Sequence, residues 1–278
     1  MGVKATRTIN SIVIVIILTI VALAVLYPLV YTVSSAFSPG NDISNMPLIP
    51  FGKGVTFDHF KTLFSGSYVR WFLNTLIIAS FTSAGTLLVA SMGAYVFSRF
   101  RFTFKKSMMM SMLILQIFPS FVGMVAIYVI LYRIGGLDTL WGLVLVYLAG
   151  NIPYNTWLVK SYMDNIPKSL DEAARIDGAN HFRIYGTIIL PIAKPILIFL
   201  TVTSFTGPWM DYIFPKMVLR SDANMTLALG LFNFVTDRKN EFTNFAAGAL
   251  LVAIPFVIFF IITQKMLVTS LGGAAVKE

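Results

Sequence analysis

The chain has 278 residues, of which 57% are hydrophobic and only 12% are charged, and its mean hydropathy is +0.80. A soluble domain has about a quarter of its residues charged, so this composition predicts an integral membrane protein with little length left for a separate soluble domain. The formal net charge of +9 could indicate a nucleic-acid partner, but in a membrane chain it more often reflects cytoplasmic anchoring, and we expect no nucleic acid.

Motifs for catalysis or metal binding are not found in the sequence. It contains no Gly-rich phosphate-binding loop followed by Lys and Ser or Thr, no Cys–His cluster and no cysteine at all. We therefore expect no catalytic residue, no metal and no cofactor on this chain, and we expect that it is not an enzyme.

Long apolar runs predict an all-α bundle of six transmembrane helices in a single domain covering residues 1–278. The predicted spans lie near residues 9–34, 72–97, 107–131, 139–160, 192–214 and 244–267. A signal peptide is the alternative for the first run, but that run is too long and has no convincing small-residue cleavage site. Small residues recur between 79 and 94, where they permit close helix contact with a partner or within the chain.

The distribution of basic residues predicts the orientation. An even number of spans places both termini on one side of the membrane. With the termini inside, the inner segments hold thirteen Lys and Arg residues and the outer loops hold eight. Because positive charge favours the cytoplasmic side, we expect cytoplasmic termini and a cytoplasmic loop at 161–191.

The apolar centres of the predicted spans have no Asp, Glu, Lys, Arg or His. Proton- or ion-driven carriers usually place such groups near the middle of the membrane. Sodium sites can also be built from backbone carbonyls, so a carrier driven by an ion gradient stays as an alternative, and a membrane scaffold without transport activity is another.

The polar passage at 167–191 predicts a short first helix. Ser169 and Glu172 form a capping-box pattern after a proline, so a helix is expected to begin at Leu170. Asp171 and Arg175 are spaced for an i,i+4 ion pair on that helix.

A second helix is expected after a sharp turn. Gly178 can adopt the left-handed conformation that ends the first helix, and Asn180 is a suitable cap for a helix running from His181 to Leu190–Pro191. Ala173 and Ala174 keep one side of the first helix thin, so a groove of a partner protein could approach its backbone. The alternative is an ordinary amphipathic helix lying on the membrane surface.

This passage resembles the "EAA" loop of the membrane subunits of ABC importers. The resemblance lies in Glu172-Ala173-Ala174, Asp177-Gly178-Ala179, Tyr185 and Ile188 to Leu190-Pro191. It implies a cytoplasmic coupling helix that sits in a cleft of the ATP-hydrolysing subunit. The coupling residues implied are Glu172, Ala173, Ala174, Arg175, Asp177, Gly178, Leu190 and Pro191. The family often has Phe at Tyr185 and Pro at His181.

Other stretches resemble the smaller permease of maltose-type sugar importers, from about residue 70 onward. They are Asn74-Thr75, Ala94 to Arg99, Leu137-Asp138-Thr139, Asn151-Ile152-Pro153, Ile166-Pro167, Trp209 to Tyr212 and Leu271 to Lys277. This resemblance implies a type I ABC importer permease fold in a bacterial or archaeal cytoplasmic membrane, as a multi-pass protein among membrane lipids.

Four polar or aromatic residues are candidates for the substrate pathway. Trp209 could stack on a sugar and Asp211 could accept hydrogen bonds from its hydroxyls, although both could instead lie at the outer membrane interface, where Trp is enriched. Asn155 and Gln116 could hydrogen-bond a sugar or another helix. Met210 stands where the family usually has Asn, which leaves any inherited polar contact at that position open.

The resemblance implies the membrane-spanning subunit of an ATP-driven sugar importer, with malto-oligosaccharides as the expected substrate. A galacto-oligosaccharide, a raffinose-type sugar or a glycerol phosphate is the alternative. The partners implied are a second homologous permease, two ATP-binding subunits that hold ATP and Mg, and an extracytoplasmic sugar-binding protein.

Overall fold

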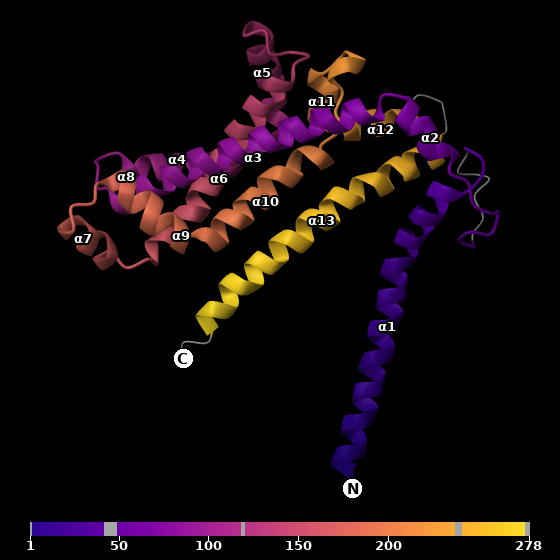
Figure 1. Cartoon of the computed structure of the whole chain (residues 1–278), viewed down its shortest axis with the longest axis horizontal. Coiled ribbons are helices and arrows are strands. Elements are labelled where there is room, and N and C mark those ends of the chain that lie inside the picture. The colour runs from indigo at the N-terminus through magenta and orange to yellow at the C-terminus, as the bar shows by residue number, and fades with distance from the viewer. Residues whose placement is uncertain (1, 42–48, 118–119, 237–240, 276–278) are drawn as a thin grey trace. The chain divides into compact units, whose positions relative to one another are not determined.

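The computed structural model describes residues 2–41, 49–117, 120–236 and 241–275. Within these ranges the ordered elements are all helical, which confirms the predicted fold class (Figure 1). The chain divides into two compact units, of which one comprises Met1–Tyr68 with Leu231–Ile254 and the other comprises Val69–Gly230 with Pro255–Glu278.

The first unit contains α1 (Gly2–Phe37), α2 (Asp58–Ser65) and the parts of α12 (Leu227–Thr236) and α13 (Phe242–Ala275) on its side of the division. His59 of α2 is buried and joins three segments. Its Nε2 lies 2.9 Å from the Ser38 carbonyl oxygen, and its Nδ1 lies 3.0 Å from Asn244 Oδ1 at the start of α13. This unit therefore has a polar contact where α1, α2 and α13 meet.

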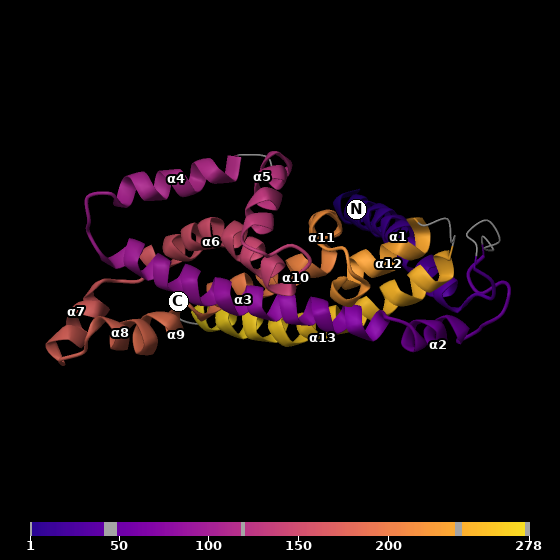
Figure 2. The ribbon, with the colours of Figure 1, turned by 90° about the horizontal axis from the view of Figure 1, so that it is seen from above.

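The second unit contains most of the helices. They are α3 (Tyr68–Arg99), α4 (Lys105–Ile117), α5 (Ser120–Arg133), α6 (Leu140–Asp164), α7 (Ser169–Ile176), α8 (His181–Ile184), a π-helix (Tyr185–Ile189), α9 (Leu190–Ile192), α10 (Lys194–Met210) and α11 (Ile213–Val218). Figure 1 and Figure 2 both place α7 and α8 beside the C-terminal end of α3.

Three helices in the described ranges are long and apolar enough to cross a membrane. They lie within α1, α3 and α13, and two bent helix pairs raise the number to as many as five. α4 and α5 form one pair, bent by 107°, so the predicted span 107–131 is not one straight helix, and its Pro119 lies outside the described residues. The predicted span 139–160 forms α6, which is 25 residues long but is not among the helices found apolar enough to cross a membrane.

Small residues bring α3 and α6 close together. A Cβ added at Gly85 would lie 2.6 Å from Leu148 Cδ2, and one added at Gly93 would lie 3.4 Å from Thr156 Cγ2. Ser83 also donates a hydrogen bond from Oγ to the Thr201 carbonyl oxygen of α10 over 2.9 Å. These small residues of α3 therefore pack within the chain, one of the two roles left open by the sequence.

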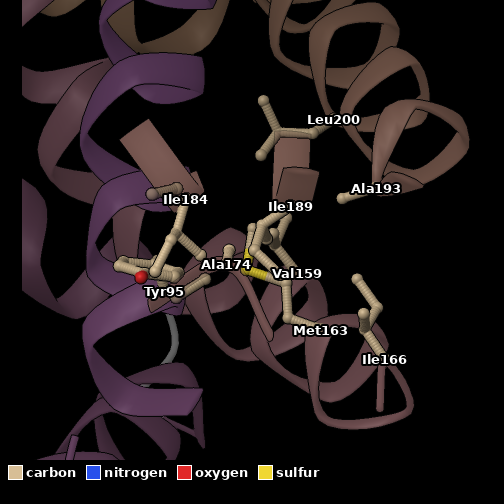
Figure 3. Close-up of a cluster of buried hydrophobic side chains, with 11 residues drawn as sticks. Tyr95, Val159, Met163, Ile166, Ala174, Ile184, Ile189, Ala193 and Leu200 are labelled. Carbon is tan, nitrogen blue, oxygen red and sulfur yellow. The ribbon is translucent and has the colours of Figure 1, made fainter. Parts of the chain in front are cut away.

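A buried hydrophobic cluster lies where α3, α6, α10 and the α7–α9 region converge (Figure 3). Its members are Ala90, Ala94, Tyr95, Val159, Met163, Ile166, Ala174, Ile184, Ile189, Ala193 and Leu200. Since Ala174 and Ile184 come from α7 and α8, the polar passage is packed onto the helical core on one of its sides.

Candidate functional site

The candidate site is the coupling segment, which we define as residues 167–192. α7 begins at Ser169, and the residue before it, Lys168, makes no side-chain cap. The predicted capping box of Ser169 and Glu172 therefore does not form. The backbone already turns at Pro167, because the Leu170 N–H donates to the Pro167 carbonyl oxygen over 3.3 Å, and Ser169 is part of the helix.

The turn after α7 has the conformation that the sequence predicts. Gly178 has a φ of +82°, in the left-handed region that favours glycine. The Ala179 N–H donates to the Ala174 carbonyl oxygen over 2.9 Å, closing the end of the helix. Asn180 Oδ1 accepts a hydrogen bond from the Arg183 N–H over 2.9 Å, so the predicted cap of the second helix is confirmed.

The second helix of the segment is not uniform. It starts as α8, continues as a π-helix over Tyr185–Ile189 and ends as α9, and the stretch is bent by 81° from α10. Pro191 lacks an N–H, so the Thr187 carbonyl has no donor four residues later, and the regular pattern of hydrogen bonds cannot continue there. Leu190 and Pro191 thus lie where the segment joins the following long helix.

The inner side of the segment contacts α3 through polar and aromatic groups. The Tyr185 hydroxyl lies 2.7 Å from Ser91 Oγ, and the Tyr95 hydroxyl lies 3.4 Å from His181 Nδ1. The rings of Phe100 and His181 have centroids 4.6 Å apart. Tyr185 and His181 are the two positions that depart from the family pattern, and here the side chains of both hold the coupling segment against α3 and the residue that follows it.

A buried ion pair joins the segment to α3. Arg99 Nε lies 2.6 Å from Asp171 Oδ2, and the two side chains are only 3% and 8% exposed. Asp171 therefore pairs with Arg99 instead of Arg175, which is exposed, and the predicted i,i+4 pair is wrong. The reason is that Asp171 is buried against Arg99 of α3, whereas Arg175, one turn later, stays exposed.

The outer side of the segment is exposed and includes most of the predicted coupling residues. These are Glu172, Ala173, Arg175, Asp177, Gly178 and Pro191, whereas Ala174 is buried and Leu190 is half-buried. Two large apolar side chains also lie there, with Ile176 88% exposed and Phe182 76% exposed. Our sequence reasoning missed both, although two large apolar residues flanking a glycine turn in a polar passage are a usable signal.

The second unit also contains a partly open cavity of about 930 Å³ between α5, α6, α11 and the end of α4. Its lining is mostly apolar, with Gln116, Tyr147, Asn151 and Asp211 as polar members. Two of the four predicted pathway residues, Gln116 and Asp211, therefore line one cavity. In the described part of the chain, no three His, Asp or Glu side chains gather as a metal site would require.

The other two predicted pathway residues, Asn155 and Trp209, do not line this cavity. Asn155 is 4% exposed, and its Nδ2 donates to the Asn151 carbonyl oxygen one turn earlier over 2.8 Å. Trp209 is 3% exposed and packs among the rings of Phe72, Phe205 and Phe256. Burial in helix packing explains both positions.

The sequence is similar to those of known membrane transport proteins. The sequence profile described as "Binding-protein-dependent transport system inner membrane component" matches residues 85–272. The galactooligosaccharides transport system permease protein GanQ of Bacillus subtilis strain 168 is 42% identical, over 99% of this chain and 98% of its own length. The maltodextrin transport system permease protein MdxG of the same strain is 38% identical over the full length of both chains.

Among solved structures, a chain from the crystal structure of a bacterial ABC transporter that imports the acidic polysaccharide alginate has the same fold. The TM-score is 0.81 at 24% sequence identity, over 94% of this chain and 97% of that chain.

Proposed function

The chain belongs to the family of binding-protein-dependent transport system inner membrane components, and from this premise we propose that it is the membrane-spanning subunit of an ATP-driven sugar importer. The curated relatives that match it over nearly its whole length are permeases for galactooligosaccharides and maltodextrin. ATP hydrolysis takes place on a partner subunit, which holds ATP and Mg.

The substrate we propose is a short oligosaccharide of neutral hexoses. Malto-oligosaccharides remain the prediction from sequence, and galacto-oligosaccharides are the second candidate because the relative that transports them is 42% identical. The cavity supports a sugar because it combines apolar walls with a few polar groups, as sites for small molecules do. Gln116 and Asp211 are the two proposed pathway residues that line it.

The single observation that supports coupling is that one side of the coupling segment is packed on the helical core while its other side is exposed. Its inner side is fixed by the Arg99–Asp171 pair and by Ala174, whereas its outer side exposes Ile176 and Phe182. Large apolar side chains exposed together at a polar turn are typical of a protein interface. We propose that this outer side, with Glu172, Ala173, Arg175, Asp177 and Gly178, fits a groove of the ATP-hydrolysing subunit.

The orientation we propose puts the coupling segment and both termini in the cytoplasm. The loop and the ends of its flanking helices contain five basic residues, Lys160, Lys168, Arg175, Arg183 and Lys194. A second homologous permease completes the pathway, and an extracytoplasmic binding protein delivers the sugar. When ATP closes the two ATP-binding subunits, their movement draws the coupling segments together and rocks the attached spans from inward-open to outward-open.

The test is to purify the tagged chain from its native membrane in mild detergent and to identify what accompanies it. We expect a second permease and an ATPase whose activity rises when the sugar-loaded binding protein is added. Maltodextrin and a galactooligosaccharide are compared as the sugar. A chain that purifies without an ATPase would contradict the proposal.

A further inference from the structure

We infer that Arg99 is a positioning residue that locks α3, α6 and α7 together, so that movement of the coupling segment passes to both long helices without loss. This inference rests on the proposed function, because it concerns how the segment transmits force. It adds a role for a residue that the coupling motif itself does not include.

The guanidinium of Arg99 bonds to both neighbouring helices. Nε pairs with Asp171 in the first turn of α7. Nη1 donates to the Met163 carbonyl oxygen over 3.0 Å, and Nη2 donates to the Ile166 carbonyl oxygen over 3.1 Å. Met163 belongs to the last turn of α6 and Ile166 to the connection that follows, so one side chain from α3 holds both ends of the link between α6 and α7.

Helix electrostatics favour this arrangement. The C-terminal end of α6 presents carbonyls with partial negative charge, which suits a cation. Asp171 lies near the N-terminal end of α7, which suits an anion. Arginine can bind the α6 carbonyls and the Asp171 carboxylate at once, because its planar guanidinium offers several donors in fixed directions. The lysine ammonium is a compact point charge and cannot do so.

A neighbouring hydrogen bond strengthens the same junction. Ser98 Oγ donates to Asp164 Oδ1 over 2.8 Å, at the last residue of α6, and Arg99 Nη1 lies 3.2 Å from the same Ser98 oxygen. Burial makes the Arg99–Asp171 contact matter, since a buried charge whose partner is removed cannot be compensated by water. Without Arg99, the short connection between Asp164 and Ser169 would become a hinge.

Loss of Arg99 is not expected to detach the segment. Ala174 still packs in the hydrophobic cluster, and Tyr185 and His181 still contact α3. We therefore expect Arg99→Ala to assemble with its ATPase and to hydrolyse ATP, but to transport poorly. Coupling between two sites typically changes a binding affinity by about 5- to 150-fold. For this coupling we expect a fall of similar order, about tenfold, in the transport per ATP hydrolysed.

The variants are designed to separate positioning from folding. Arg99→Lys keeps the charge beside Asp171 but cannot bond both carbonyls, so we expect intermediate coupling. The double variant Arg99→Met with Asp171→Leu removes the pair without leaving a buried charge, so it stays testable if Arg99→Ala fails to fold. Arg101→Ala is the matched control, because Arg101 is an exposed arginine two residues along the chain, and we expect it to behave as wild type.

A distance measurement tests the lock independently of the ATPase. The natural chain has no cysteine, so spin labels can be attached to an otherwise normal chain at Val96→Cys on α3 and Asp177→Cys at the end of α7, both exposed positions. We expect a narrow distance distribution with Arg99, and a broad one with Arg99→Ala or with the double Met–Leu variant.

The outcomes separate the two proposals. If the wild-type chain has no ATPase partner, the proposed function fails while the spin-label distances still report on the lock. If the distances stay equally narrow without Arg99, the lock is contradicted whatever the transport activity. If the distances broaden but the complex transports as much sugar per ATP as wild type, the transmission role of Arg99 is contradicted.

Discussion

Tyr147 donates its hydroxyl hydrogen to Asp211 Oδ2 over 2.9 Å, joining α6 to the start of α11 across the wall of the cavity. The other carboxylate oxygen, Oδ1, accepts a hydrogen bond from the Phe214 N–H over 3.2 Å and so caps α11. Asp211 therefore has a structural task as well as a place in the cavity. Gln116 lines the same cavity from the end of α4, is exposed, and is the clearer candidate for direct contact with a sugar.

Gln116→Ala is expected to raise the KM for sugar uptake while leaving thermal stability unchanged, because substitution of an exposed residue usually alters the unfolding free energy by less than about 0.5 kcal/mol. Asn155→Ala is the contrasting variant. Asn155 is buried, so its loss is expected to lower the melting temperature without changing the KM. Uptake assays and thermal unfolding in detergent measure both effects, and an unchanged KM for Gln116→Ala would remove it from the pathway.

Ile176→Asp and Phe182→Asp are each expected to prevent stable association with the ATPase. Both side chains are exposed in this chain, so the change should not affect folding, whereas truncation of an interface anchor costs about 2 kcal/mol or more of binding free energy. Copurification of the ATPase with the tagged chain is the measurement. Ile49→Ala, which alters a 75% exposed apolar residue outside the segment, is the control and should copurify normally. Normal association of both aspartate variants would place the interface elsewhere.

Gly178→Ala is expected to destabilise the turn of the coupling segment by about 1–2 kcal/mol, because a side chain disfavours the left-handed conformation. Gly186→Ala is the matched control, since Gly186 is helical, and an added Cβ would meet no atom within 4 Å. We expect transport to fall only in the first variant. Equal activity of the two would show that the turn geometry is not needed.

Glu172→Lys and Gly178→Pro are expected to abolish transport with membrane insertion intact.

Local rules predicted the turn and the second cap of the coupling segment, although the capping box that they predicted at Ser169 and Glu172 does not form. The turn at Gly178 and the cap at Asn180 were correct because a glycine's φ and a side-chain cap are decided within a few positions. The Asp171–Arg175 pair was wrong because a local rule cannot see Arg99, which only the packing of α3 against α7 brings to Asp171.

The residues that line the cavity could not be chosen from the sequence for the same reason, since they too depend on how the helices pack. Asp211 and Gln116 were chosen as polar residues in apolar spans, but so were Asn155 and Trp209, which are buried in helix packing. Which of the four faces an open space depends on the rotation of each helix, and apolar composition on all sides of a membrane helix hides that rotation. Hydropathy likewise gave one continuous span at 107–131, whereas α4 and α5 are bent by 107° from one another.

Protonation of Asp138 is expected to lower the free energy of unfolding at acid pH. It lies between α5 and α6, and although burial acts to raise its pKa, hydrogen bonds from the Arg220 and Ser221 N–H groups and from Ser221 Oγ hold the pKa below its ordinary value. The folded pKa is thus lower than the unfolded one, so this stabilisation is present above the unfolded value of about 3.9 and is lost as the pH falls through the folded value. Thermal unfolding between pH 6 and pH 3 should show a weaker acid dependence for Asp138→Asn, and an identical dependence would contradict the assignment.

The most direct test of the account is sugar uptake by vesicles containing the purified complex, with the binding protein and labelled oligosaccharide outside and either ATP inside or an imposed ion gradient as the energy source. We predict uptake with ATP, none with the gradient alone, and no ATP-driven uptake when the wild-type chain is replaced by Ile176→Asp and the subunits are reconstituted together. Uptake driven by the gradient in vesicles that contain this chain alone would contradict the account and would identify a carrier that needs no ATPase.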